Sequence, residues 1–150
     1  MMKRGCGVFG RGGEALSRRE LVAVRSGLAP RVCPCAFSYA SVQRWTLVSS
    51  PYALNEVLRN LPKLPAGATA EWLRLRPQVT VVDDVVSMDR PVIFAASKDR
   101  PILFSALAWA EVLLTLDKAD FADVLGGAFY GLTVVLPYDF LERERAAGRL

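Results

Sequence analysis

Short apolar segments typical of buried strands alternate with helical segments between residues 45 and 146. The expected strands are "RWTLVSS" (44–50), "QVTVV" (78–82), "EVLLTL" (111–116) and "LTVVLP" (132–137). Strands that alternate with helices of about ten residues are typical of βαβ units, in which helices cover a parallel sheet. The sequence therefore predicts an α/β fold with a mostly parallel central sheet.

The helical segments between these strands have recognisable starts. Ser50 and Pro51 suit the N-cap and first positions of a helix over "PYALNEVLRNL" (51–61). Its expected apolar face consists of Leu54, Val57, Leu58 and Leu61. Thr69 is expected to cap a second, short helix through "EWLRLR" (71–76). A third helix, "RPILFSALAWA" (100–110), is apolar nearly all round and should be buried on more than one side.

Residues 1–44 differ from the rest of the chain in composition. Residues 1–45 carry 8 Lys or Arg against 2 Asp or Glu, whereas residues 46–150 carry 11 against 13. The first segment is rich in Gly and Arg and offers only a weak helical stretch around residues 16–24. Its "GCGVFG" (5–10) lacks the preceding strand that a dinucleotide-binding loop needs. We therefore divide the chain into an atypical basic segment, 1–44, interpreted as disordered or out of frame, and a domain at 45–150. Translating the upstream DNA in the other two frames tests the second interpretation.

Composition also limits the chemistry. The chain contains 3 cysteines and no histidine, which excludes Ser-His-Asp and Cys-His nucleophile systems and disfavours zinc. Catalysis would have to depend on carboxylates, lysines or a hard metal ion. No apolar run reaches the roughly 18 residues of a membrane span, and no signal-peptide core is visible. A soluble, cytoplasmic protein is expected.

Four acidic residues are candidates for a functional site. Asp117 follows the strand "EVLLTL", at the strand end where α/β proteins bind ligands. Asp99 begins the buried helix, Glu56 lies one turn into the helix at 51–61, and Asp120 follows Asp117 by three residues. Each has a structural alternative: Asp117 as the cap of the turn after its strand, Asp99 as a helix cap, Asp120 as a first-turn residue and Glu56 as a solvated side chain. Together, such carboxylates would favour a hard cation such as Mg²⁺ or Mn²⁺.

Three segments resemble the PIN-domain family in order and spacing. "KDRPILFSALAWAEVLLTLDKADF" (98–121) resembles the family's buried helix, followed by a strand ending in Thr-x-Asp. "VSSPYALNEVLRNL" (48–61) resembles its earlier helix with an acidic residue, and "GLTVVLPYDFLERE" (131–144) its last strand and closing helix. The resemblance covers about residues 45–146. It implies a three-layer sandwich and a metal-dependent endoribonuclease, often the toxin of a VapC-like toxin–antitoxin pair.

The resemblance also implies roles for individual residues. Glu56, Asp99 and Asp117 would be catalytic, metal-binding acids with Mg²⁺ or Mn²⁺ as cofactor. Asp120 would be a fourth metal ligand, and Thr115 would contact substrate or a ligating water. The implied partners are an RNA substrate, an antitoxin protein and a second copy of the chain in a homodimer, with no membrane.

One expected acid is missing. PIN domains begin with a strand that ends in a metal-binding Asp, whereas this chain has no Asp before Asp83. "GVFGRGG" (7–13) stands roughly where that strand should be, with Gly10 and Arg11 instead. We therefore expect the first strand to be missing or irregular, and the nuclease to be either whole or impaired by the missing acid. The alternatives are a catalytically inactive PIN-like protein that only binds a partner such as an antitoxin, and a nucleotide- or small-molecule-binding α/β domain whose acids are caps.

Overall fold

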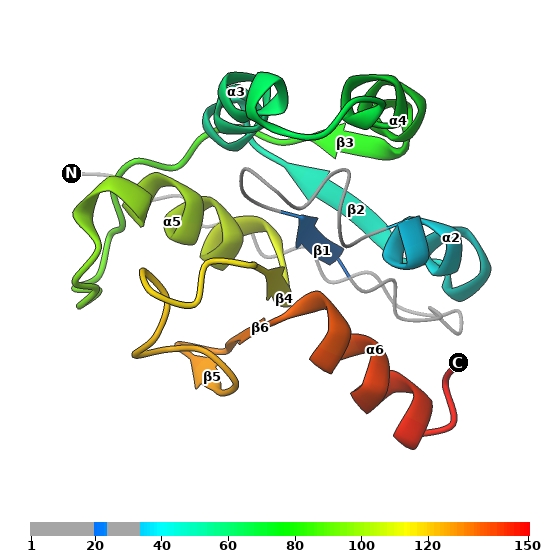
Figure 1. Cartoon of the computed structure of the whole chain (residues 1–150). Helices are drawn as coiled ribbons and strands as arrows, with labels where there is room; N and C mark the ends of the chain where they lie inside the picture. Colours follow the sequence, from blue (N-terminus) through cyan, green and yellow to red (C-terminus); the bar gives the residue numbers. More distant parts are fainter. Residues whose placement is uncertain (1–19, 24–33) are drawn as a thin grey trace, which may run out of the picture.

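The computed structural model describes residues 20–23 and 34–150, which form a mixed α/β fold (Figure 1). Its six-stranded sheet has the order β3-β2-β1-β4-β6-β5. The strands are β1 (Glu20–Ala23), β2 (Thr46–Ser49), β3 (Val79–Val81), β4 (Val112–Leu114), β5 (Ala128–Phe129) and β6 (Leu132–Val135). All neighbouring strands are parallel except β5 and β6. The predicted α/β class and mostly parallel sheet are confirmed.

Helices pack against both faces of this sheet (Figure 1). They are α2 (Pro34–Gln43), α3 (Pro51–Asn60), α4 (Ala68–Leu75), α5 (Arg100–Trp109) and α6 (Pro137–Ala146). Short 3₁₀ helices occupy Leu61–Lys63, Arg76–Gln78 and Ser97–Asp99. None of the helices described between residues 34 and 150 has the length and apolar character needed to cross a membrane.

Alternation along the strands divides the buried side chains into two large cores. In β4, Val112 and Leu114 belong to one core, and Leu113 belongs to the other, because successive strand residues point to opposite faces. Apolar side chains of α2 and α6 complete the first core. Those of α3 and α5 complete the second, in which Ile102, Leu103 and Ala106 of α5 have no exposed surface. This confirms the prediction that the helix at 100–110 is buried.

The expectation of a missing first strand is wrong. β1 lies at the centre of the sheet and pairs in parallel with β2 on one side and β4 on the other. It consists of Glu20–Ala23, so the helical interpretation of this stretch is also wrong, and "GVFGRGG" (7–13) lies outside the described residues. A four-residue strand is stabilised by hydrogen bonds to distant partners, which local sequence does not reveal.

A helix also precedes residue 45. In α2, Ala36, Phe37 and Ala40 are buried in the same core as Trp45 and Leu47. The change in composition at Trp45 is therefore not a boundary of packing in the part of the chain that the structure describes. The proposed division into 1–44 and 45–150 stays a prediction for the residues outside that part.

The start of α3 is as expected, and two other details differ. Ser50 is the N-cap, and its side chain accepts a hydrogen bond from the Ala53 backbone N–H. Leu58, expected on the apolar face, is 55% exposed. α4 begins after Gly67, whose φ of 93° lies in the left-handed region, so Thr69 is not its cap. Glycine adopts this conformation without steric cost, which explains the earlier start.

Residues 82–96 connect β3 to the start of α5 without regular secondary structure. Side chains nevertheless hold this segment in place. The Val85 backbone N–H donates to Ser105 Oγ at 2.9 Å, and Trp109 Nε1 donates to the Asp83 carbonyl at 3.1 Å. Both partners belong to α5, so the connection is fixed along that helix.

Candidate functional site at the carboxyl edge of the sheet

The order of the strands places a switch point between β1 and β4. From β1 the chain adds β2 and β3 on one side, and later adds β4 and β6 on the other. In open α/β sheets, ligands bind beyond the carboxyl ends of the strands at such a point. The residues that follow β4, Thr115 to Asp120, lie at this edge.

Asp117 organises the turn that follows β4. Thr115 is only 1% exposed, and its Oγ1 accepts a hydrogen bond from the Asp117 backbone N–H at 3.1 Å. Asp117 Oδ1 in turn accepts a hydrogen bond from the Asp120 backbone N–H at 2.7 Å. Residues 118–126 form turns. Asp117 therefore caps a turn with one carboxylate oxygen, the structural role weighed against metal binding.

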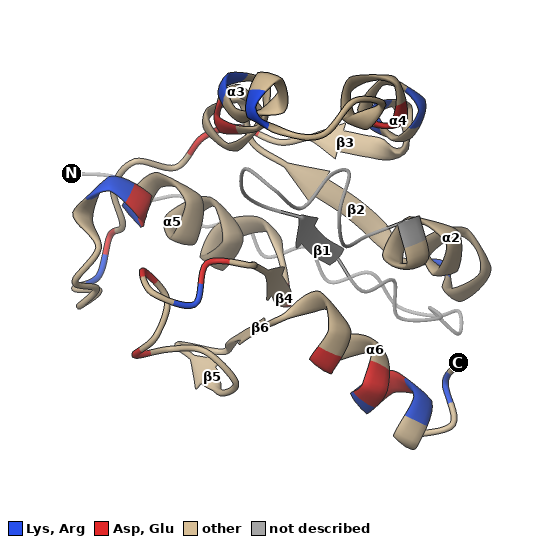
Figure 2. Cartoon of the chain, viewed as in Figure 1, with Lys and Arg blue, Asp and Glu red and all other residues tan. Residues whose placement is uncertain are grey.

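The start of α5 lies beside this turn. Lys98 Nζ forms an ion pair with Asp120 Oδ2 at 2.7 Å. Asp99 follows Lys98 and is 3% exposed. Asp99 occupies the N-cap position of α5, as its structural alternative proposed, but its side chain makes no capping hydrogen bond with the first turn of that helix. The ion pair therefore holds the segment that carries Asp99 next to the turn that carries Asp120. A shared site for the predicted acids requires these two segments to be neighbours. Figure 2 shows the acidic residues of the loop after β4 and the charged start of α5.

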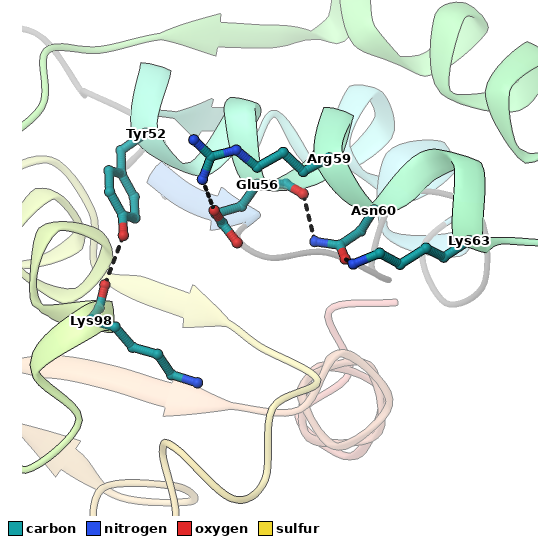
Figure 3. Close-up of polar contacts among 6 residues, drawn as sticks. All are labelled: Tyr52, Glu56, Arg59, Asn60, Lys63 and Lys98. Atoms are coloured by element: carbon teal, nitrogen blue, oxygen red, sulfur yellow. Dashed lines mark hydrogen bonds and ion pairs between the residues drawn. The ribbon is translucent and has the colours of Figure 1, made fainter.

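Helix α3 contributes from the neighbouring side. The Tyr52 hydroxyl donates a hydrogen bond to the Lys98 carbonyl at 2.9 Å (Figure 3). Glu56 lies one turn further along α3, and its Oε1 pairs with Arg59 Nη1 at 2.8 Å. The Glu56 carboxylate is thus turned to a cation of its own helix, as Figure 3 shows.

The predicted acids do not assemble a metal centre. Among the described residues, no three Asp, Glu or Cys side chains form a group that could hold a metal ion. The acid expected after the first strand is also absent from the sequence, because the next acidic residue after Glu20, at the amino end of β1, is Glu56. Oxygen donors suit Mg²⁺ or Mn²⁺, but the arrangement of these side chains does not fit a complete site.

Sequence reasoning missed three residues that shape this edge. Lys98 and Tyr52 join the segments by the contacts above. Asp84, in the connection after β3, accepts hydrogen bonds from the Tyr52 backbone N–H at 3.0 and 3.2 Å. A carboxylate is favourable at a helix N-terminus because the helix dipole is positive there. Of these three residues, only Lys98 could have been suspected from the sequence, because it directly precedes the candidate Asp99.

A cavity of about 630 Å³ lies apart from the predicted residues. It is lined by Val92, Ile93, Phe94, Ala95, Arg100, Asp123, Val124 and Phe129. Arg100 donates to the Phe94 carbonyl at 3.1 Å, so its guanidinium is engaged by the wall of the cavity. Glu56, Asp99 and Asp117 are not among the residues that line it.

Comparison with protein families, curated proteins and solved structures finds no match to this chain. The resemblance to the PIN-domain family therefore stays a prediction.

Proposed function

We propose that this chain is a PIN-like protein with a three-layer sandwich, and that it acts as an endoribonuclease at the carboxyl edge of its sheet. In this proposal it is the toxin component of a toxin–antitoxin pair, with RNA as substrate and an antitoxin as protein partner. Glu56, Asp99 and Asp117 are its candidate catalytic acids, and Thr115 and Asp120 assist them.

The convergence of three separate segments supports this proposal. The ion pair between Lys98 and Asp120 joins the start of α5 to the turn after β4. The hydrogen bond from Tyr52 to the Lys98 carbonyl joins α3 to the same place. These segments carry the residues that resemble the PIN motifs, and they meet at the switch point where α/β proteins bind ligands.

The resemblance implies a divalent cation that would stabilise charge on a phosphodiester. Because the described carboxylates do not complete a site for it, we assign it no step. The chain itself supplies a buried Thr115 that orients Asp117, and Lys98, whose side chain is 64% exposed. A lysine at this edge would attract the phosphate backbone of RNA.

A second candidate is a catalytically inactive PIN-like protein that acts by binding an antitoxin. The observation that favours it is the pairing of Glu56 with Arg59 and of Asp120 with Lys98. The negative charges of these carboxylates are balanced by basic side chains of the same chain. This is the arrangement expected of a metal site that has lost one of its acids and no longer binds the ion.

A ribonuclease assay separates the two candidates. Purified protein is incubated with a mixed-sequence RNA in Mn²⁺, then with excess EDTA, beside Asp117→Asn and Asp99→Asn prepared in the same way. The matched control is Asp89→Asn, because Asp89 is an exposed aspartate that has no proposed role. The endoribonuclease should cleave in Mn²⁺, lose cleavage in EDTA and in both site variants, and retain it in the control. RNA cleavage that continues in EDTA would refute the proposed endoribonuclease. The absence of cleavage at any protein concentration would also refute it and would support the catalytically inactive protein.

A further inference from the structure

We propose that the cavity beside the start of α5 binds a small zwitterion with an apolar body, which is the chemistry of an apolar amino acid or a short apolar peptide. Its volume of about 630 Å³ lies within the range of about 300–1,000 Å³ that is usual for small-molecule sites. The inference goes beyond the proposed ribonuclease and does not depend on it, because Glu56, Asp99 and Asp117 do not line this cavity.

Three segments that are distant in the sequence build the walls of the cavity. Residues 92–95 end the connection between β3 and α5, and Arg100 is the first residue of α5. The other walls come from the turns after β4 and from β5. Connections as long as residues 82–96 without regular secondary structure are uncommon in compact domains and usually carry a function. The cavity gives this connection a function.

The apolar surface of the cavity is aromatic and already packed. Phe94 and Phe129 both line it, and their ring centroids are 6.4 Å apart. Phe94 also packs against Phe121 at 5.3 Å, and Phe121 has no exposed surface. Rings held against a buried ring are in place before a ligand arrives. Together with Val92 and Val124, they offer an apolar surface to the body of the ligand.

One cationic and one anionic side chain also line the cavity. Arg100 donates from Nε and Nη2 to the Phe94 carbonyl at 3.3 and 3.1 Å, which holds its guanidinium against the wall. Asp123 belongs to the turns on the other side. Within residues 34–150, neither side chain forms an ion pair with the other or with a third residue. The remaining N–H groups of Arg100 can therefore donate to a ligand carboxylate.

The two charges select for a ligand that carries both signs. A simple anion would be attracted by Arg100 and repelled by Asp123, and a simple cation would meet the opposite. A zwitterion places its carboxylate toward Arg100 and its ammonium group toward Asp123, so each charge is balanced. Its apolar part then covers the aromatic surface between them.

NMR titration of the isotope-labelled, full-length protein tests the inference. Backbone amide shifts are followed with L-phenylalanine, whose charges are adjacent, and with leucyl-phenylalanine, whose charges are further apart. We expect saturable shifts at residues 92–95 and 123–129 for at least one of them, with a Kd of about 1 mM or tighter. The tighter ligand distinguishes an amino acid from a peptide. The N-acetylated and the amidated form of that ligand each lack one charge and should bind about tenfold more weakly.

Variants locate the site. Arg100→Met and Asp123→Asn should each weaken binding about tenfold, and Ala95→Trp, which fills the cavity from an exposed position, should abolish it. The matched control is Arg143→Met, because Arg143 likewise donates to a backbone carbonyl, that of Gly126, at 3.0 Å, but does not line the cavity. This control should bind as wild type does.

Three results would overturn the inference. They are the absence of saturable shifts with both ligands, equal affinities for the charged and capped forms, and equal losses in Arg100→Met and Arg143→Met. If Arg100→Met does not fold, the capped ligands still decide the question on the wild-type protein. Since no RNA is used, a failed ribonuclease assay does not affect this result.

Discussion

Replacing Asp117 in two ways separates its structural role from its proposed chemical role. Asp117→Asn removes the charge but keeps a carbonyl oxygen that can accept the hydrogen bond from the Asp120 N–H. Asp117→Ala removes both. If the 2.7 Å bond to Asp117 Oδ1 holds the turn, the alanine variant should be clearly less stable than the asparagine variant.

The expected difference follows from this single contact. Loss of a capping hydrogen bond costs about 1 kcal/mol in the free energy of unfolding. Asn is as good a capping residue as Asp, so Asp117→Asn should lose less than half of that amount. With a slope of about 2 kcal/mol per M of urea, the midpoints of the two variants should differ by roughly 0.3–0.5 M.

Urea unfolding followed by circular dichroism measures these midpoints, and the ribonuclease assay is run on the same preparations. The proposed nuclease requires both variants to be inactive, although Asp117→Asn stays close to wild type in stability. Equal midpoints for the two variants would refute the capping role. Full activity of a folded Asp117→Asn would refute the catalytic one.

Two further perturbations test the core and the surface charges. Phe121 has no exposed surface, so Phe121→Ala should lower the free energy of unfolding by about 3–5 kcal/mol; a loss below about 1 kcal/mol in urea unfolding would contradict its place in the core. The hydrogen bond from Arg74 lowers the pKa of Glu71 from its ordinary value of 4.5. Because the pKa of Glu71 is lower in the folded protein, the stabilisation that the ionised Glu71 gains from Arg74 is present above pH 4.5. It is lost as the pH falls through the folded-state pKa. The difference in Tm between wild type and Glu71→Gln should therefore shrink in acid, and a difference that is constant from neutral to acid pH would disprove it.

Local signals predicted those elements whose ends carry strong capping residues. Ser50 and Pro51 identified the start of α3, and the short apolar runs of "EVLLTL" (111–116) and "LTVVLP" (132–137) identified β4 and β6. The β5–β6 hairpin was missed, although its turn at Tyr130 and Gly131 has φ values of 50° and 90°. A Gly before a strand can indicate such a turn, but the two-residue strand β5 is too short for a hydrophobic pattern.

Non-local contacts explain the other misses. β1 is a strand because β2 and β4 pair with both of its sides, and neither partner lies near it in the sequence. The edge that carries Asp117 was predictable, since it follows a buried strand. The pairing of Lys98 with Asp120 was not, because it depends on how α5 packs beside the turn after β4.

The central position of β1 affects how the protein is made. β1 can pair with β2 once Ser49 has been synthesised, but its other neighbour, β4, ends at Leu114. At about 5–20 residues per second, synthesis of the intervening chain takes roughly 3–13 seconds. During that interval a nascent chain has one side of its innermost strand unpaired, and unpaired strand edges recruit other chains. The protein is therefore most open to aggregation while it is still on the ribosome, at a stage that the stability of the finished sheet does not influence.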